Sequence, residues 1–94
     1  MLSVIWSEES DADLAHIVEY IGQFNPIAAT ELWRALVESV EHLPEHPYMY
    51  RSSKRMPGCR EIVAHPNYLV VYHVGMEHIE VLRVLHARRN FPVD

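Results

Sequence analysis

Apolar residues in the first quarter of the chain recur at helical spacing. After Ser7 or Ser10, either of which can cap a helix, the sequence is acidic and then places apolar side chains at i, i+3, i+4 and i+7. These apolar residues are Leu14, Ile17, Val18 and Ile21. We expect an amphipathic helix near residues 8–23, ending at Gly22 or just beyond it.

A second helical pattern begins at Asn25 and Pro26, a capping side chain followed by a proline that suits the first helical position. One stripe of this helix then comprises Ala28, Leu32, Ala35, Leu36, Ser39 and Leu43, which are apolar except for Ser39. We expect this helix over residues 26–43, stopped by Pro44. Trp33, Val37 and Val40 widen the stripe to roughly 200°. The width indicates either a helix sunk in the core or a groove for a partner.

The remaining apolar runs have the length and composition of strands. Residues 2–6 form one, and residues 59–65, 68–74 and 78–86 form three more, separated by turn residues. The run at 68–74 is apolar on both faces and should be central. Residues 44–57 are expected to be a loop, with a short edge strand near 48–51. The pattern predicts a single α+β domain, residues 1–94, of order β-α-α-β-β-β, with an antiparallel sheet packed on a helical hairpin.

Composition supports a small globular domain. Of 94 residues, 49% are hydrophobic and 22% are charged, which shows no bias toward disorder or a fibrous repeat. The sequence has no run of roughly 20 apolar residues and no signal-peptide features at its start, so we expect a cytoplasmic protein. Cys59 is the single cysteine, which excludes an internal disulfide and a thiolate zinc site.

Charge is distributed unevenly along the chain. Residues 1–47 hold nine acidic side chains against one basic one, a net charge of -8. Residues 48–94 hold seven basic side chains against four acidic ones, a net charge of +3. This asymmetry indicates either two working faces or a simple partition of charge between helix surfaces and strands.

Arg83 is an arginine on an otherwise apolar strand face. Strict alternation puts it on the same face as Ile79, Val81 and Leu85, and puts Leu82, Val84 and His86 on the other face. One interpretation is structural, an ion pair with a helix acid such as Glu19 or a side chain that snorkels along the sheet edge. The other is recognition of an anion.

The segment LHARRNF gathers the residue types that act on phosphodiesters. His86 can transfer protons, Arg88 and Arg89 can hold phosphate, and Phe91 can stack on a base. The same residues suit a basic peptide-binding edge or a solvated end of the chain. Pro44 separates His42 from His46, so we expect no metal site. Nucleotide-binding and hydrolase motifs are absent, so we expect no cofactor.

Several segments resemble the RelE/ParE superfamily of type II toxins. PGCREIV, HPNYLVVYHV and VLRVLHARRNFP are similar to its C-terminal half, and DLAHIVEYI and NPIAATELW to its opening. The resemblance implies a curved antiparallel sheet backed by two helices. It also implies a cognate antitoxin that wraps the toxin in a hetero-oligomer.

The superfamily has two main activities, and the residues favour one of them. RelE-like members cut messenger RNA on the ribosome with lysines or a glutamate on the first meander strand, an arginine on the next, and an arginine and an aromatic residue near the end. Here Glu61 and Val63 stand at the lysine positions and Leu69 at the strand arginine, while Arg88 matches and Phe91 lacks a hydroxyl. The resemblance therefore implies the ParE-like activity, inhibition of DNA gyrase.

Two alternatives stay open. In a ribosome-dependent nuclease, Glu61 and His86 would form an acid–base pair supported by Arg60 and Arg88. A catalytically inert protein that only binds its antitoxin is the other. We expect contacts to the antitoxin or target at Trp33, Val37, Arg60, Arg83, His86, Arg88, Arg89 and Phe91, with antitoxin acids meeting the region from Arg83 to Arg89.

Overall fold

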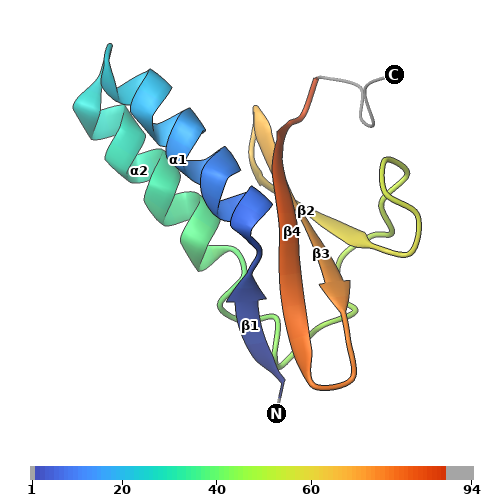
Figure 1. The fold of residues 1–94 in the computed structure, drawn as a ribbon. Coiled ribbons are helices and arrows are strands. Elements are labelled where there is room, and N and C mark those ends of the chain that lie inside the picture. The colour runs from blue at the N-terminus through green and yellow to red at the C-terminus, as the bar shows by residue number, and fades with distance from the viewer. Residues whose placement is uncertain (1, 89–94) are drawn as a thin grey trace.

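The computed structural model describes residues 2–88, in which two helices lie on one face of a four-stranded sheet (Figure 1). The elements are β1 (Ser3–Trp6), α1 (Glu8–Gly22), α2 (Pro26–Glu38), β2 (Arg60–His65), β3 (Tyr68–Val74) and β4 (His78–His86). The α+β class and the order β-α-α-β-β-β are confirmed. The segment near 48–51 forms no strand, and a single bridge joins Ser52 to Arg60 instead.

Both helices begin at the predicted caps. The Ser10 N–H donates to Ser7 Oγ at 3.1 Å, and the Ala28 N–H donates to Asn25 Oδ1 at 3.1 Å. Helix α2 ends at Glu38, five residues before the predicted end. The Ser39 hydroxyl donates to the Leu36 carbonyl at 2.6 Å, and residues 39–45 continue as turns. The helical spacing of apolar residues continues through these turns, because Val40 and Leu43 are still buried in the core.

The strand order is β1-β4-β3-β2, so β3 is internal as predicted. It pairs antiparallel with both β2 and β4. The sheet is mixed rather than wholly antiparallel, because the edge strand β1 runs parallel to β4 from Ser3 opposite His78 to Trp6 opposite Val81. The Ser7 N–H then donates to the Val81 carbonyl at 2.9 Å, and α1 starts at once.

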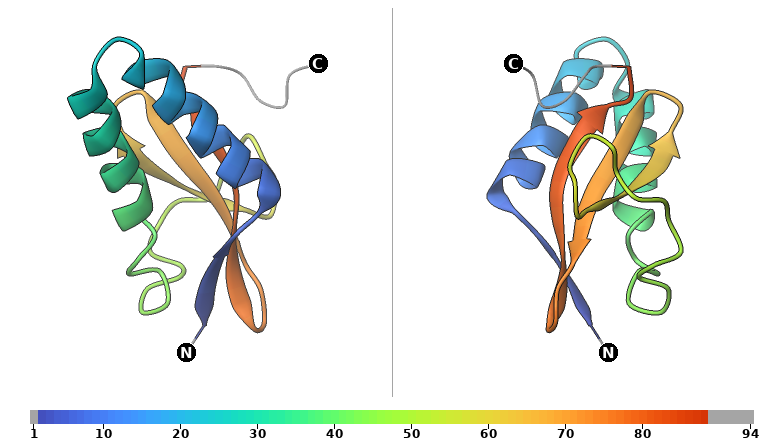
Figure 2. Two further views of the ribbon diagram at one scale, coloured as in Figure 1. Left: turned by 60° about the vertical axis from the view of Figure 1, so that its left-hand side comes forward. Right: turned by 90° about the vertical axis from the view of Figure 1, so that its right-hand side faces the viewer.

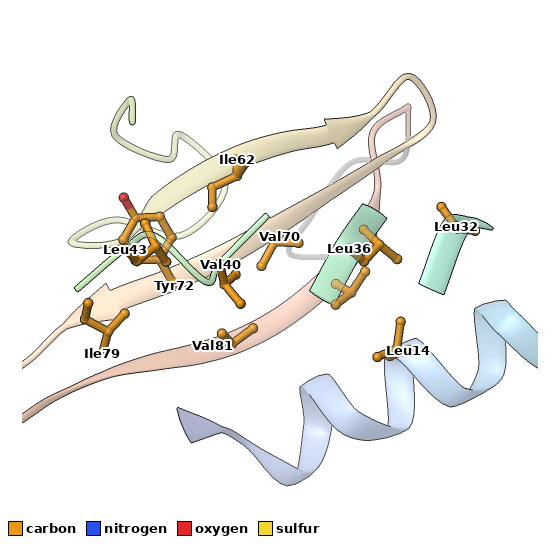
Figure 3. Packing of buried hydrophobic residues seen from close by; sticks show 11 residues of the cluster. Leu14, Leu32, Leu36, Val40, Leu43, Ile62, Val70, Tyr72, Ile79 and Val81 are labelled. Carbon is orange, nitrogen blue, oxygen red and sulfur yellow. The ribbon is translucent and has the colours of Figure 1, made fainter. Parts of the chain in front are cut away.

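The main core lies between the hairpin and the sheet. Leucines from both helices pack on side chains of β3 and β4, as Figure 3 shows for Leu14, Leu32, Leu36, Val70, Tyr72, Ile79 and Val81. The Tyr72 hydroxyl donates to the Pro47 carbonyl at 2.8 Å. This bond satisfies a buried polar group and ties the segment after α2 to the sheet.

A smaller core covers the opposite face of the sheet. The right-hand view of Figure 2 shows the yellow-green segment before β2 crossing this face, away from the helices. Beneath it Cys59, Leu69 and Val71 form a buried cluster, flanked by half-buried Met56, Leu82, Leu85 and Ala87. Strand β3 is therefore covered on both faces, on one side by the helices and on the other by a loop of the same chain.

Candidate functional site

A β-bulge in β4 sets which side chains reach each face. Val71 lies opposite Arg83 and Tyr72 lies opposite Val81, so Leu82 is the extra residue. Val84 therefore packs in the main core, whereas Leu82 and Leu85 pack in the smaller one. The strict alternation expected along this strand is wrong beyond Leu82, because one inserted residue exchanges the two faces.

Arg83 is held by a helix acid, as one of the two interpretations predicted. The acid is Asp13 rather than Glu19: Arg83 Nε donates to Oδ2 at 2.7 Å and Nη2 donates to Oδ1 at 3.0 Å. Asp13 Oδ2 also accepts the Val84 N–H at 3.0 Å, just beyond the point where β1 stops covering β4. Hydrogen bonding to Asp13 raises the pKa of Arg83. The pair links α1 to the part of β4 that β1 does not cover.

Glu61 is the buried charge of the outer face, with only 3% of its surface exposed. Arg51 donates to Oε2 from Nη2 at 2.6 Å and from Nε at 3.0 Å, and Arg55 Nη1 lies 3.3 Å from the same oxygen. Arg55 Nη2 also donates to the Ala87 carbonyl at 2.7 Å. We call Arg51, Arg55 and Glu61 the outer ion cluster. It joins the loop to both β2 and the end of β4.

The outer ion cluster fixes the protonation state of Glu61. Burial raises the pKa of Glu61, but hydrogen bonds from Ser53 and Arg51 and the charges of Arg51 and Arg55 outweigh it, and the pKa falls below its ordinary value. Near neutral pH the carboxylate of Glu61 is therefore ionised and hydrogen-bonded to Arg51 and Arg55. A general base needs a pKa close to the working pH, so this environment makes Glu61 a poor proton acceptor.

The structure does not bring Glu61 and His86 together. Glu61 lies opposite Val71 on the outer face. His86 lies opposite Tyr68, with ring centroids 5.2 Å apart, and Tyr68 packs against the main core on the helix side. Arg60 lies opposite Tyr72, also on the helix side. Among the candidate nuclease residues, Glu61 thus lies on one face of the sheet and Arg60 and His86 lie on the other.

The remaining cationic candidates are held locally or lie at the end of β4. Arg60 Nη1 donates to the Tyr50 carbonyl at 2.7 Å, and its guanidinium lies 5.1 Å from the centroid of the Tyr48 ring. Arg88 is exposed, and its N–H donates to His86 Nδ1 at 3.2 Å. Arg89 and Phe91 lie outside the described residues.

The positions where a RelE-like site would carry cations are apolar in structure as well as in sequence. Val63 is exposed on the outer face of β2, and Leu69 is buried beneath the loop. Neither side chain can hold a phosphate.

The wide stripe predicted over residues 26–43 is partly core and partly surface. Val40 is buried and Val37 is half-buried against the main core, whereas Trp33 is 48% exposed. Sequence reasoning missed a further apolar group at the turn between the helices: Tyr20, Phe24 and Ile27 are all exposed, and the Tyr20 and Phe24 rings meet edge-on at 5.4 Å. An aromatic pair four residues apart, outside the core-facing stripe, was the available signal.

Residues 2–88 contain neither a cluster of metal-binding side chains nor a membrane-spanning helix. In this range no three His, Cys, Asp or Glu side chains are grouped so that they could hold a metal ion. His42 instead shares a hydrogen bond of 2.6 Å between its Nε2 and the Tyr50 hydroxyl. None of the helices in the same range is long and apolar enough to cross a membrane.

Solved structures share this fold. A chain of the chromosomal ParDE toxin–antitoxin system from P. aeruginosa superposes with a TM-score of 0.80 at 23% identity, over 92% of this chain and 96% of that one. A chain of the YoeB dimer from Staphylococcus aureus superposes with a TM-score of 0.58 at 15% identity, over 87% of this chain and 92% of that one. A conserved hypothetical protein from Helicobacter pylori superposes with a TM-score of 0.59 at 18% identity, over 97% of this chain and 100% of that one. At these identities the likeness shows the fold alone.

Sequence comparison shows the family. Toxin RelE2 of Caulobacter vibrioides is 35% identical over 89 residues, which cover 95% of this chain and 99% of that protein. Residues 4–91 match the family described as ParE toxin of type II toxin-antitoxin system, parDE. The match spans both helices, strands β2 to β4 and all but the first residue of β1. The chain therefore belongs to the ParE toxin family of type II toxin–antitoxin systems.

Proposed function

We propose that this toxin inhibits DNA gyrase and does not cleave RNA. The observation that carries the proposal is the state of Glu61, buried and engaged by Arg51 and Arg55. A gyrase inhibitor acts on an enzyme of the chromosome, so we also propose that the protein works in the cytoplasm.

RNA cleavage requires a base, an acid and positive charge around one phosphate. Here the carboxylate that could serve as the base is committed to the outer ion cluster, and His86 lies on the other face of the sheet. Val63 and Leu69 add no charge. Gyrase inhibition requires none of this chemistry, because it depends on a binding surface.

Membership of the family implies a cognate protein antitoxin. We propose that the antitoxin or target contacts Trp33 and Val37 on α2, and Arg88 at the end of β4 with the neighbouring Arg89 and Phe91. Exposed apolar surface on a small domain marks partner sites, and Trp33 supplies it. Arg60 and Arg83 already bind groups of this chain, which disfavours them as primary contacts.

The test runs a gyrase supercoiling assay beside a translation assay that maps cuts in messenger RNA, with the same purified protein. We expect supercoiling to stop at concentrations that produce no cuts in the ribosomal A site. Specific A-site cuts without gyrase inhibition would make the protein a RelE-like nuclease. Activity in neither assay, with antitoxin binding intact, would make it an inert binding protein; either result overturns the proposal.

A further inference from the structure

We propose that the loop over the outer face of the sheet binds the phosphate backbone of duplex DNA. The residues that would hold the phosphates are Arg51, Lys54, Arg55 and Arg88, which we call the basic loop surface. The inference deepens the proposed function, because an inhibitor of DNA gyrase works beside duplex DNA. It is tested without gyrase, so the two proposals can fail separately.

Contacts with Glu61 and Ala87 bring the basic loop surface together from distant parts of the chain. Arg51 Nη2 and Arg55 Nη1 lie 2.6 Å and 3.3 Å from the same atom, Glu61 Oε2. Arg55 Nη2 also donates to the Ala87 carbonyl at 2.7 Å, which joins the loop to the residue just before Arg88. The positive charges of the loop and of the end of β4 therefore lie next to each other.

The charges of this surface are open to solvent. The Arg51 side chain is 63% exposed; its Nε and Nη2 bind Glu61, and within residues 2–88 its Nη1 has no partner. Lys54 is exposed and forms no hydrogen bond or ion pair in the same range. Arg88 is exposed as well. Donors are thus available to a ligand without breaking the contacts that hold the loop.

The surface is strongly positive although the chain as a whole is negative. Its four cations face the single carboxylate of Glu61, a net charge of +3 in a chain whose total is -5, and residues 46–76 contain no other acid. The acidic residues of α1 and α2 belong to helices on the opposite side of the sheet, as the views of Figure 2 show. A polyanion would therefore be attracted to the outer side and repelled from the helices, which also sets the orientation of the protein on it.

The composition of the loop favours a duplex backbone over other anions. Protein interfaces are centred on apolar and aromatic side chains, but residues 51–59 expose no large apolar side chain, and Val63 is an isolated one on the neighbouring strand. Single-stranded RNA is held by stacking of its bases on aromatic rings, and residues 51–59 contain no aromatic residue. Arginine, lysine and a serine hydroxyl such as that of the exposed Ser52 are the groups that contact backbone phosphates.

The salt dependence of DNA binding tests the inference. Fluorescence anisotropy follows the binding of the full chain to a labelled duplex of about 20 base pairs at several salt concentrations. If roughly three or four phosphates are neutralised, the logarithm of the association constant should fall with the logarithm of the salt concentration at a slope of about -3. Lys54→Gln breaks no contact of residues 2–88, so it should not disturb the fold. It should weaken binding about threefold at low salt and bring the slope to about -2. The double variant Arg51→Gln, Lys54→Gln should weaken binding by about tenfold.

Arg34→Gln is the matched control, because Arg34 is an exposed cation on α2 and its loss changes the net charge equally. Its affinity and its slope should equal those of the parent, and circular dichroism melting verifies that each variant is folded. A loss as large as that of Lys54→Gln would show that only the total charge matters, and the inference would be wrong.

Three further results would overturn the inference. The parent may fail to bind the duplex at low salt, or it may bind a single-stranded RNA of the same length more tightly, which would make RNA the partner. Polyglutamate at equal charge concentration may displace the duplex, which would make an acidic peptide the partner. Supercoiling is assayed separately: a parent that binds DNA as expected but leaves gyrase active would refute the proposed function and support this inference.

Discussion

The two faces of β3 are equally buried but are closed by different means. On the helix side, Val70 and Tyr72 lie under leucines of both helices, and the contacts are almost entirely apolar. On the outer side, Leu69 and Val71 lie under an irregular loop that is anchored by the outer ion cluster. The contribution of the helix side to the free energy of unfolding should depend on packing. The contribution of the outer side should also change with pH and with single changes of charge.

The largest effect should come from the helix-side face. Leu36→Ala removes a fully buried side chain between α2 and the sheet, and we expect it to lower the free energy of unfolding by about 2–5 kcal/mol. Urea denaturation measures the loss. Ile27→Ala, an exposed position on the same helix, should change stability by less than about 0.5 kcal/mol. A similar loss at both positions would contradict the placement of the core.

The outer face should be the next most sensitive. Glu61→Gln keeps the shape of the side chain but removes the charge that holds Arg51 and Arg55, and we expect a loss of about 1–3 kcal/mol. Arg51→Gln, whose parent side chain is mostly exposed, should cost less. If Glu61→Gln unfolds at the same urea concentration as the parent, the cluster does not hold the loop.

The pH dependence of stability should distinguish the two faces. The pKa of Glu61 is lowered in the folded protein, so its contribution is complete above its ordinary pKa of 4.5 and is lost as pH falls through the folded value. We expect the parent to lose stability below about pH 4.5 more steeply than Glu61→Gln does. Parallel curves for the two proteins would show that the shift is absent.

Much of the fold could be predicted because its boundaries carry local chemical signals. Ser7, Asn25 and Pro26 start the helices, and Pro66 and Asn67 turn the chain between β2 and β3. The end of α2 could not be predicted, because the apolar period continues into the turns that follow. The bulge at Leu82 could not be predicted either, since the partner strand and the sheet edge determine it.

The candidate site was less predictable because it depends on contacts between distant segments. The ion pair of Arg83 was expected, but the choice of Asp13 over Glu19 follows from the position of β4 against the first turns of α1. Arg51 and Arg55 lie in a loop without periodicity, so nothing in the sequence placed them on Glu61. The available signal was the charged Glu61 between the apolar Cys59 and Val63 on the same face of the strand.

A smaller effect should follow from opening the edge of β4. Asp13→Ala removes the acceptor of Arg83 and of the Val84 N–H, and we expect a loss of about 1–2 kcal/mol. Thermal unfolding measures it. Glu19→Ala, at the acid expected from the sequence, should lie within about 0.5 kcal/mol of the parent. The reverse order would restore the sequence-based assignment.

The smallest effect concerns the start of α2. Asn25→Ala removes the side chain that accepts the Ala28 N–H, and we expect a loss of about 1 kcal/mol. Gln23→Ala, two residues earlier, should be nearly neutral in the same denaturation experiment. An equal loss at both positions would indicate that the hairpin turn as a whole, and not the cap, was disturbed.

The most direct test of the account compares the parent with Glu61→Gln in both functional assays, at a temperature where both are folded. If Glu61 is structural and the protein is a gyrase inhibitor, the parent cuts no messenger RNA in the ribosomal A site. Both proteins should then inhibit supercoiling at the same concentration, although the variant is less stable. A-site cuts by the parent that Glu61→Gln abolishes would contradict the account, because they would make Glu61 a catalytic residue.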